Sequence, residues 1–190
     1  MRYDRKIVIE ECEGVYPPRE DTFLLLEAVS IVPGEKVLEM GCGTCIISLH
    51  CAEMGADVTA ADVNPHAVSC ARDNARRNHI ELEVVHSDLF LDVQGTFDVM
   101  IFNPPYLPSE EEGLIDASWA GGESGVKVLE RFLADAPSHL RKGGRIYVLL
   151  SSMMKSVDLN CVLTQYRRER LASRTLFYEE LWVEKLSLSS

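Results

Sequence analysis

The sequence has no run of about 20 apolar residues, the length that a helix needs to cross a bilayer. Its polar N-terminus leads into only a short apolar run at residues 7–9, too short for a secretory signal. Basic residues are also scarce, because 19 Lys and Arg stand against 30 Asp and Glu, a formal net charge of −11. Proteins bind nucleic acids by neutralising phosphates with Lys and Arg. These absences favour a cytoplasmic protein with no membrane contact and no direct nucleic-acid contact.

The sequence has six cysteines but neither a secretory signal nor the paired cysteine or histidine motifs of a zinc site. Without a signal we interpret them as reduced thiols of a cytoplasmic protein. Cys42 and Cys45 form one C-x-x-C pair, but a structural zinc ion needs four ligands, and no second C-x-x-C or H-x-x-x-H is present. We therefore expect no metal, and we interpret these two cysteines as small residues that fill a turn.

Alternating short apolar and helical segments predict an α/β fold. With 190 residues, no repeat and no linker, the chain is expected to form a single domain over residues 1–190. Strands alternating with helices indicate a parallel sheet that is covered on both faces. The predicted strands are residues 36–40, 57–62, 81–86, 97–102 and 144–150, and the predicted helices lie near residues 20–30, 45–54, 65–78, 125–140 and 156–170.

The C-terminal tail carries a second kind of pattern. Residues 175–178 and 181–186 predict two antiparallel strands that are joined by a tight acidic turn. The basic cluster at residues 167–170 is interpreted as the solvated end of the last helix and not as a binding patch.

A glycine-rich turn follows the first predicted strand. Gly41 and Gly43 stand at the passage from strand to helix, where glycine lets the backbone bend sharply and approach a ligand closely. The dinucleotide motif G-x-G-x-x-G would need a glycine at position 46, which is Ile46. The segment from Glu39 to Cys45 instead resembles the E/D-x-G-x-G-x-G motif of class I S-adenosylmethionine (SAM)-dependent methyltransferases, with Cys45 in place of the last glycine. This resemblance implies that Glu39, Gly41 and Gly43 bind SAM.

Two aspartates follow the next two predicted strands. Asp62 closes the second strand, where an acid can accept hydrogen bonds from both ribose hydroxyls of a nucleotide cofactor. Asp88 follows the third strand, and in the methyltransferases that the turn resembles the acid at this place reaches the adenine amino group. Either aspartate alone could equally be a helix cap or a loop residue. Together they favour a SAM site that includes Asp62, Asp88 and Leu89.

The fourth predicted strand ends in Asn103, Pro104, Pro105 and Tyr106. This segment resembles the [N/D]-P-P-[Y/F] motif of methyltransferases that modify exocyclic amines and side-chain amides. Asn103 Oδ1 and the Pro104 carbonyl can each accept one N–H hydrogen bond, which would hold a planar –NH₂ group toward a methyl donor. The prolines fix the backbone, and Tyr106 offers a flat face for stacking. We therefore predict catalytic roles for Asn103, Pro104 and Tyr106, substrate binding by all four residues, and a cofactor contact by Asn103.

Two further segments narrow the resemblance. Residues 15–26 are similar to the V-Y-x-P-x-E-D-T-F-L-L-L segment of HemK-like glutamine methyltransferases of class I release factors, and residues 117–125 are similar to the A-W-A-G-G-x-x-G stretch of their archaeal and eukaryotic branch. The likeness covers roughly residues 7–186. It implies the class I methyltransferase (Rossmann-like) fold, a mostly parallel seven-stranded sheet with helices on both faces and an antiparallel C-terminal strand. It also implies that Thr22 lies over the cofactor.

The resemblance further implies a substrate and a partner. The substrate is the glutamine of the Gly-Gly-Gln loop in a class I translation release factor. The chain begins almost directly at the catalytic domain, as in the branch that works with a small zinc-binding activator protein. In class I methyltransferases the third strand lies at a sheet edge, so we expect the activator to add a strand to residues 81–86.

Two other functions stay open at this point. A methyltransferase of adenine or guanine amines would need a basic partner to supply the missing charge. A non-catalytic SAM-binding subunit would have no use for the intact Asn103 motif.

The acidic loop at residues 109–123, with glycines as hinges, is predicted to close over the substrate entrance.

Overall fold

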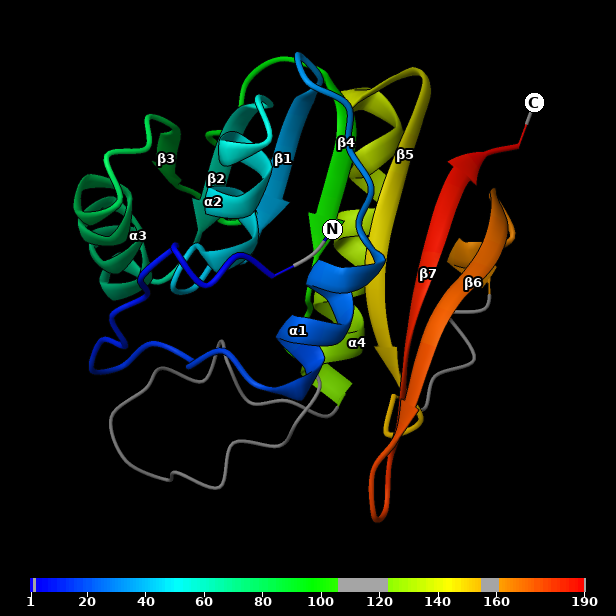
Figure 1. Cartoon of the computed structure of the whole chain (residues 1–190). Coiled ribbons are helices and arrows are strands. Elements are labelled where there is room, and N and C mark those ends of the chain that lie inside the picture. The colour runs from blue at the N-terminus through cyan, green and yellow to red at the C-terminus, as the bar shows by residue number, and fades with distance from the viewer. Residues whose placement is uncertain (2, 106–122, 155–160, 190) are drawn as a thin grey trace.

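A single mixed sheet organises the chain. The computed structural model describes residues 1, 3–105, 123–154 and 161–189 (Figure 1). Seven strands form the sheet in the order β3-β2-β1-β4-β5-β7-β6. The strands from β1 to β5 pair in parallel, and β7 runs antiparallel to both β5 and β6. The bounds are β1 Lys36–Met40, β2 Asp57–Asp62, β3 Glu83–His86, β4 Phe97–Phe102, β5 Leu140–Ser151, β6 Tyr166–Thr175 and β7 Glu180–Leu188. This architecture confirms the predicted fold class.

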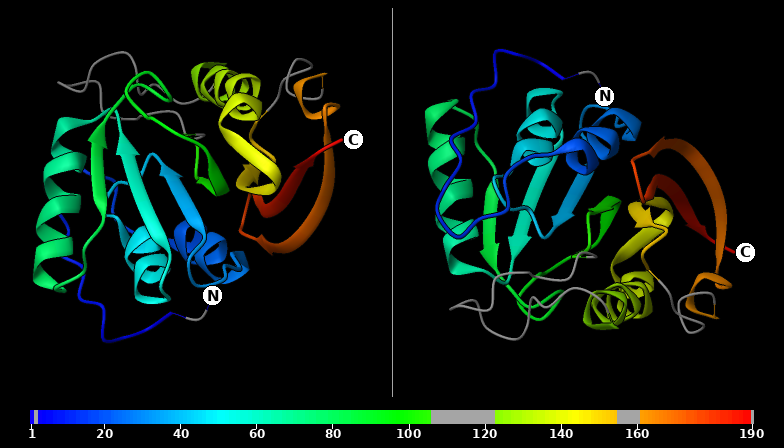
Figure 2. Two further views of the ribbon diagram at one scale, coloured as in Figure 1. Left: turned by 90° about the horizontal axis from the view of Figure 1, so that it is seen from above. Right: turned by 90° about the horizontal axis from the view of Figure 1, so that it is seen from below.

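Helices cover both faces of the sheet (Figure 2). Successive side chains on a strand point to opposite faces, so Val37 packs with α1 and α2 while its neighbour Leu38 packs with α4. The same alternation assigns Val99 to the first face and Met100 to the second. The bounds are α1 Glu20–Ala28, α2 Ile46–Glu53, α3 Pro65–Arg77 and α4 Glu123–His139. No helix in these described stretches is long and apolar enough to span a membrane.

The prediction of a helix near residues 156–170 is wrong for its second half. Residues 155–160 lie outside the described residues, and β6 begins at Tyr166, so the basic cluster at residues 167–170 lies on a strand. Arginine, glutamate and leucine are good helix formers, but pairing with β7 overrides that preference. Arg168 donates two hydrogen bonds to Glu184 across the strands, at 2.6 and 2.7 Å.

The tail forms the expected hairpin with a shifted turn. The strand predicted at residues 175–178 is wrong, because β6 ends at Thr175 and residues 176–179 form the turn itself. The partner strand β7 contains the predicted residues 181–186. Aromatic residues at the turn gave it the appearance of a strand, since aromatics are enriched in strands.

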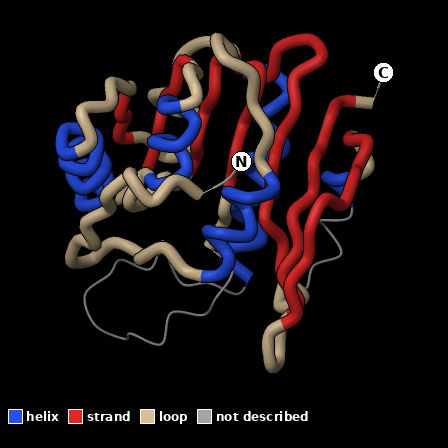
Figure 3. Tube along the Cα trace, viewed as in Figure 1, coloured by secondary structure: helices blue, strands red, loops and turns tan. Residues whose placement is uncertain are grey.

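The N-terminal segment runs alongside α3 before it reaches α1 (Figure 3). The Asn78 side chain donates to the Val8 carbonyl and accepts from the Val8 N–H, both at 2.8 Å. Asn74 makes the same pair of contacts with Glu10, at 2.9 and 3.0 Å. These two asparagines fix the path of an irregular segment through its backbone.

A disulfide joins this segment to α3. Cys12 and Cys70 are bonded although 58 residues separate them in the sequence. The expectation that all six cysteines are reduced thiols is therefore wrong for this pair, because the path of the N-terminal segment over α3 could not be read from cysteine spacing. Cys42, Cys45, Cys51 and Cys161 are free.

Candidate active site

The predicted site residues gather at one edge of the sheet. The carboxyl ends of parallel strands share an edge, which is where open α/β sheets bind their ligands. Gly41 follows β1, Asp62 ends β2, Asp88 follows β3 and Asn103 follows β4. The N-terminus of α1 lies at the same edge (Figure 1). The structure thus brings together the residues of the glycine turn, both aspartates and the Asn103 motif.

The glycine turn uses backbone conformations that favour glycine. Gly41 and Gly43 have φ angles of +64° and +52°, and Cys45, at the place of the third motif glycine, has a φ of +70°. A left-handed conformation costs a non-glycine residue about 1–2 kcal/mol, so the cysteine keeps the shape of the motif at some expense in stability. A Cβ atom on Gly41 would lie 3.4 Å from the Phe102 ring, and one on Gly43 would lie 3.7 Å from the Tyr16 carbonyl. The end of β4 and the N-terminal segment therefore lie within van der Waals distance of the turn.

Asp62 is buried behind this turn. Its Oδ2 atom accepts the Gly43 N–H at 2.9 Å, and its Oδ1 atom accepts the Asn64 N–H at 2.9 Å. Burial raises the pKa of the Asp62 carboxyl, and the backbone N–H donors oppose that rise. A carboxylate has four lone pairs, so acceptor capacity remains for a ligand hydroxyl beside these backbone donors.

Glu39 has its hydrogen bonds inside the protein. The Ser48 N–H donates to Glu39 Oε2 at 2.8 Å, and the Ser48 hydroxyl donates to the same oxygen. Burial raises the pKa of Glu39 to about 8. These contacts tie β1 to α2, and contact of Glu39 with a cofactor stays a prediction.

Asp88 lies at the mouth of the site. Its carboxylate forms an ion pair with Arg131 of α4 at 2.9 Å, and both side chains are about half exposed. Leu89 is buried with a φ of +51°, and the Ser87 hydroxyl holds this turn by donating to the Leu89 carbonyl at 2.7 Å. An adenine amino group would therefore share Asp88 with a guanidinium.

Asn103 is held by a residue that the sequence analysis missed. Its Nδ2 atom donates to Asp21 Oδ2 at 2.9 Å, and Asp21, in the first turn of α1, is only 3% exposed. The other end of the carboxamide, Asn103 Oδ1, is buried and has no hydrogen-bond partner among the described residues. Buried polar atoms are normally paired, so this acceptor is available to a ligand N–H. The only signal for Asp21 in the sequence is its place in the E-D-T segment, directly before Thr22.

Two neighbours complete the surroundings of Asp21. The Thr22 hydroxyl donates to Asp21 Oδ1 at 3.3 Å and accepts the Arg19 N–H at 3.4 Å, so Thr22 orients the carboxylate and caps α1. Burial and the nearby Asp21 carboxylate raise the pKa of Tyr16 to about 12. The Tyr16 hydroxyl therefore stays protonated beside a carboxylate at neutral pH.

Of the other predicted site residues, the structure describes the two prolines after Asn103. Pro104 is buried and Pro105 half-buried directly after Asn103. Tyr106, most of the acidic loop at residues 109–123 and the start of the stretch at residues 117–125 lie outside the described residues.

The C-x-x-C pair lies within the glycine turn. Cys42 and Cys45 are both buried, and hydrogen bonding to Cys45 together with burial holds the pKa of the Cys42 thiol well above its ordinary value. Thiols in this state are poor nucleophiles and poor metal ligands. In the described part of the chain no group of three or more His, Cys, Asp or Glu side chains is placed to hold a metal.

Comparison with known proteins adds a family and several relatives. The family described as "Methyltransferase small domain" matches residues 19–171. A putative protein N5-glutamine methyltransferase of Methanocaldococcus jannaschii is 44% identical over 144 residues, 73% of either chain. The methyltransferase HEMK2 of Mus musculus is 38% identical over 151 residues, 71% of either chain.

A solved complex resembles the chain in three dimensions. It is the Mtq2–Trm112 complex of E. cuniculi, described as responsible for methylation of the eRF1 translation termination factor. The matching chain has a TM-score of 0.71 and 25% identity, over 92% of this chain and 99% of that one. The similarity therefore extends over nearly the whole of both folds.

Proposed function

The chain belongs to the methyltransferase small domain family, and from that membership we propose that it transfers a methyl group from SAM to the side-chain amide of a glutamine in a class I translation release factor. The observation that carries this proposal is the buried, unpaired Asn103 Oδ1 atom. An acceptor in that state suits an –NH₂ group, which brings the hydrogen that the atom lacks.

The residues at the edge of the sheet fit SAM. Gly41 and Gly43 hold left-handed backbone conformations that disfavour side chains, and Asp62 lies beside them with acceptor capacity left for ligand hydroxyls. These three residues, with Asp88 and Leu89, would hold the nucleoside of SAM. When bound, SAM supplies an electrophilic methyl group on its sulfonium.

Asn103 and Pro104 would orient the target nitrogen. An amide nitrogen is a poor nucleophile because its lone pair is delocalised into the carbonyl. Asn103 Oδ1 and the Pro104 carbonyl would each accept one N–H of the target, which aims the nitrogen and favours its tetrahedral form. Asp21 occupies the Nδ2 end of Asn103, so the carboxamide presents an acceptor and not a donor.

A labelled-methyl assay tests this function. The chain is incubated with labelled SAM and, separately, with release factor, duplex DNA and RNA, and the methylated residue is mapped in peptides. We expect label on one glutamine of the release factor. Label on adenine or guanine alone would establish the nucleic-acid function instead, and SAM binding without transfer to any acceptor would indicate the non-catalytic subunit.

The structure also supports a partner at β3. This strand ends the sheet, so its outer backbone groups have no neighbouring strand in the described part of the chain. Arg72 donates to the Val84 carbonyl at 2.9 Å and so occupies one acceptor that an added strand would use. We propose that a small zinc-binding activator protein pairs with this edge and displaces Arg72.

Hydrogen exchange on the mixed proteins tests the partner. We expect the amides of residues 81–86 to gain protection, and the variant Arg72→Ala to bind at least as well as the wild type because the Val84 carbonyl is already free. Binding of the activator without protection of these amides would show that it docks elsewhere.

A further inference from the structure

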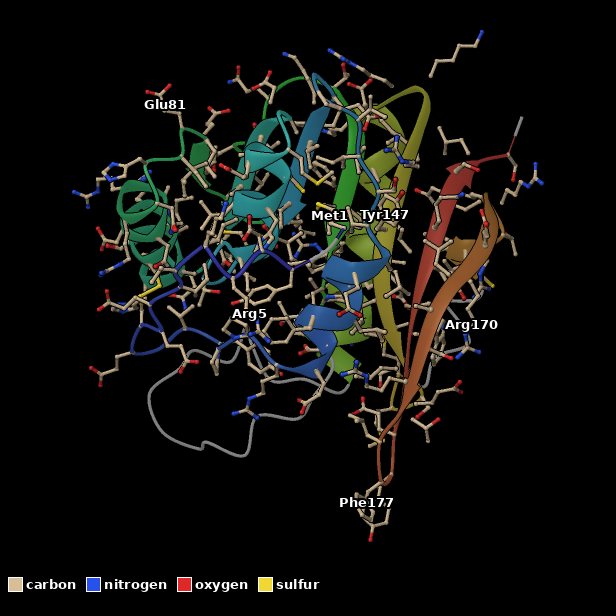
Figure 4. All side chains as sticks on the ribbon, viewed as in Figure 1. Met1, Arg5, Glu81, Tyr147, Arg170 and Phe177 are labelled. Carbon is tan, nitrogen blue, oxygen red and sulfur yellow. A yellow bond between two sulfur atoms is a disulfide. The ribbon has the colours of Figure 1, made fainter. Side chains whose placement is uncertain are left out.

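Two aromatic side chains project from the turn between β6 and β7. Phe177 stands at the tip of the hairpin (Figure 4) and is 99% exposed. Tyr178 is 93% exposed, and the two ring centroids lie 6.4 Å apart. Single exposed apolar residues are common on protein surfaces. Two adjacent aromatic rings that contribute almost nothing to the core are instead typical of the residues that dominate protein interfaces.

The turn that carries these rings is well supported. The Leu176 N–H donates to the Glu179 carbonyl at 2.7 Å, which closes the turn. Ser152, just after β5, donates its N–H to the Glu180 carbonyl at 2.9 Å and accepts the Glu180 N–H at 3.0 Å. Leu176 packs against the core beneath α1. The rings are therefore presented by backbone that is fixed at both ends, which reduces the entropy lost on binding.

The turn projects from the same edge of the sheet as Asn103. Phe102 of β4 pairs with Val148 of β5, and Ser151 at the end of β5 pairs with Leu181. The turn lies a few residues beyond that last pair, so Phe177 is roughly 20 Å from the level of Asn103 at ~3.3 Å per residue. A standard protein interface of about 800 Å² per partner spans about 30 Å. A protein whose glutamine reaches Asn103 is thus large enough to cover Phe177.

An open pocket lies where the start of α1 meets the end of β6. Its lining residues are Pro18, Arg19, Glu20, Phe23 and Arg174. Arg174 is close to the end of β6, and Arg19 immediately precedes the helix that carries Asp21. Neither arginine forms an ion pair with another described residue. The Arg19 guanidinium lies over the Tyr16 ring, 5.5 Å from its centroid. Two arginines against one carboxylate give the pocket lining a formal charge of +1 on a chain of net charge −11.

We propose that Phe177, Tyr178, Arg174 and Arg19 form a docking surface for the protein substrate, which they contact outside its methylated loop. The occupant is the release factor itself, through an apolar segment that carries acidic side chains. This inference rests on the proposed function and extends it, because the docking surface would make the enzyme select a folded protein over a short peptide of the same sequence.

The test compares two substrates and two variants. The substrates are the intact release factor and a five-residue peptide centred on the target glutamine, which is too short to reach the turn. The docking variant is Phe177→Ser/Tyr178→Ser. The control is Val32→Ser, which removes an apolar side chain that is 60% exposed in the connection before β1, at the opposite edge of the sheet.

We expect the docking variant to lose about tenfold or more in kcat/KM for the release factor and to keep its kcat/KM for the peptide. Calorimetry in the absence of SAM should show that the docking variant also binds the release factor more weakly than the wild type does. Arg174→Glu should give the same selective loss, whereas the control should behave as wild type on both substrates.

Three results would overturn the inference: unchanged affinity and rate with the release factor, an equal loss on protein and peptide, or weaker binding of the activator or of a second copy of the chain instead. A wild-type protein that methylates neither substrate and does not bind the release factor would overturn the proposed function itself. These results are distinguishable because the wild type alone tests the function and the variants test the docking surface.

Discussion

Asn103 Nδ2 and Asp21 Oδ2 lie 2.9 Å apart, and this contact decides which end of the Asn103 carboxamide is presented to a ligand. A carboxylate accepts hydrogen bonds and donates none, so it binds the NH₂ end. The carbonyl end is left buried and unpaired. The site is thus built for a group that donates N–H bonds, which agrees with an amide or amine and disfavours an acceptor such as a carboxylate.

Replacement of Asn103 should abolish most transfer. Asn103→Ala removes the acceptor for the target N–H, and loss of one preorganised hydrogen-bonding group reduces kcat by ~10²–10³-fold. SAM affinity should change little, because Gly41, Asp62 and Asp88 are expected to hold the cofactor. Turnover at the wild-type rate would remove Asn103 from the mechanism.

Replacement of Asp21 should act through Asn103. Asp21→Ala frees the carboxamide to flip, so we expect kcat to fall by roughly tenfold or more. Asp21→Asn keeps an oxygen that accepts the Asn103 N–H, and it should restore much of the rate. The measurement is kcat and KM for both variants beside their thermal unfolding. Equal loss in the Ala and Asn variants would show that the charge of Asp21, and not the orientation of Asn103, is what matters.

Asp62→Ala should weaken SAM binding first. Losing a charged acceptor for ribose hydroxyls costs about 1.5–3 kcal/mol, on the order of tenfold to a hundredfold in Kd. Asp62→Asn is the matched control, because it keeps one oxygen for the Gly43 or Asn64 N–H. Calorimetry that finds unchanged SAM affinity in Asp62→Ala would mean that the ribose is held elsewhere.

Sequence patterns predicted the parallel half of the sheet better than the rest. Strands β1, β2 and β4 are short and largely buried, so their sequence pattern predicts burial on both faces. The edge strand β6 is largely exposed and rich in arginine, and only its pairing with β7 makes it a strand.

The candidate site shows the same difference between features that local sequence predicts and features that depend on tertiary contacts. Residues that belong to one contiguous motif, such as Gly41, Gly43 and Asn103, could be predicted from local pattern. The contact between Asp21 and Asn103 could not, because 82 residues separate them and nothing local indicates it. The bond between Cys12 and Cys70 depends likewise on a tertiary path.

Glu39 should make stability depend on pH in the direction opposite to most acids. Its pKa is about 8 in the folded protein against an ordinary value of 4.5, so between these values the folded state binds more protons than the unfolded one. The free energy of unfolding should therefore fall as pH rises from 5 to 8, by about 1.4 kcal/mol per pH unit at most. Glu39→Gln keeps an acceptor for Ser48 and should remove this dependence. The free energy of unfolding of both proteins is measured in urea across this pH range. If it changes with pH equally in the wild type and in Glu39→Gln, the raised pKa of Glu39 is wrong.

Reduction of the disulfide should destabilise the protein and weaken its cofactor site. A cross-link between residues 58 apart stabilises the folded state by ~4 kcal/mol, because it restricts the unfolded chain. The N-terminal segment that it holds continues to Tyr16, whose carbonyl lies over Gly43, so loosening the segment uncovers the glycine turn. We expect dithiothreitol, or Cys70→Ser, to lower the urea midpoint and to raise the Kd for SAM. Cys161→Ser is the control, because that cysteine is free and exposed. Because Asn74 and Asn78 still hold the segment, the fold itself should survive, and an unchanged urea midpoint after complete reduction would refute the role given to this bond.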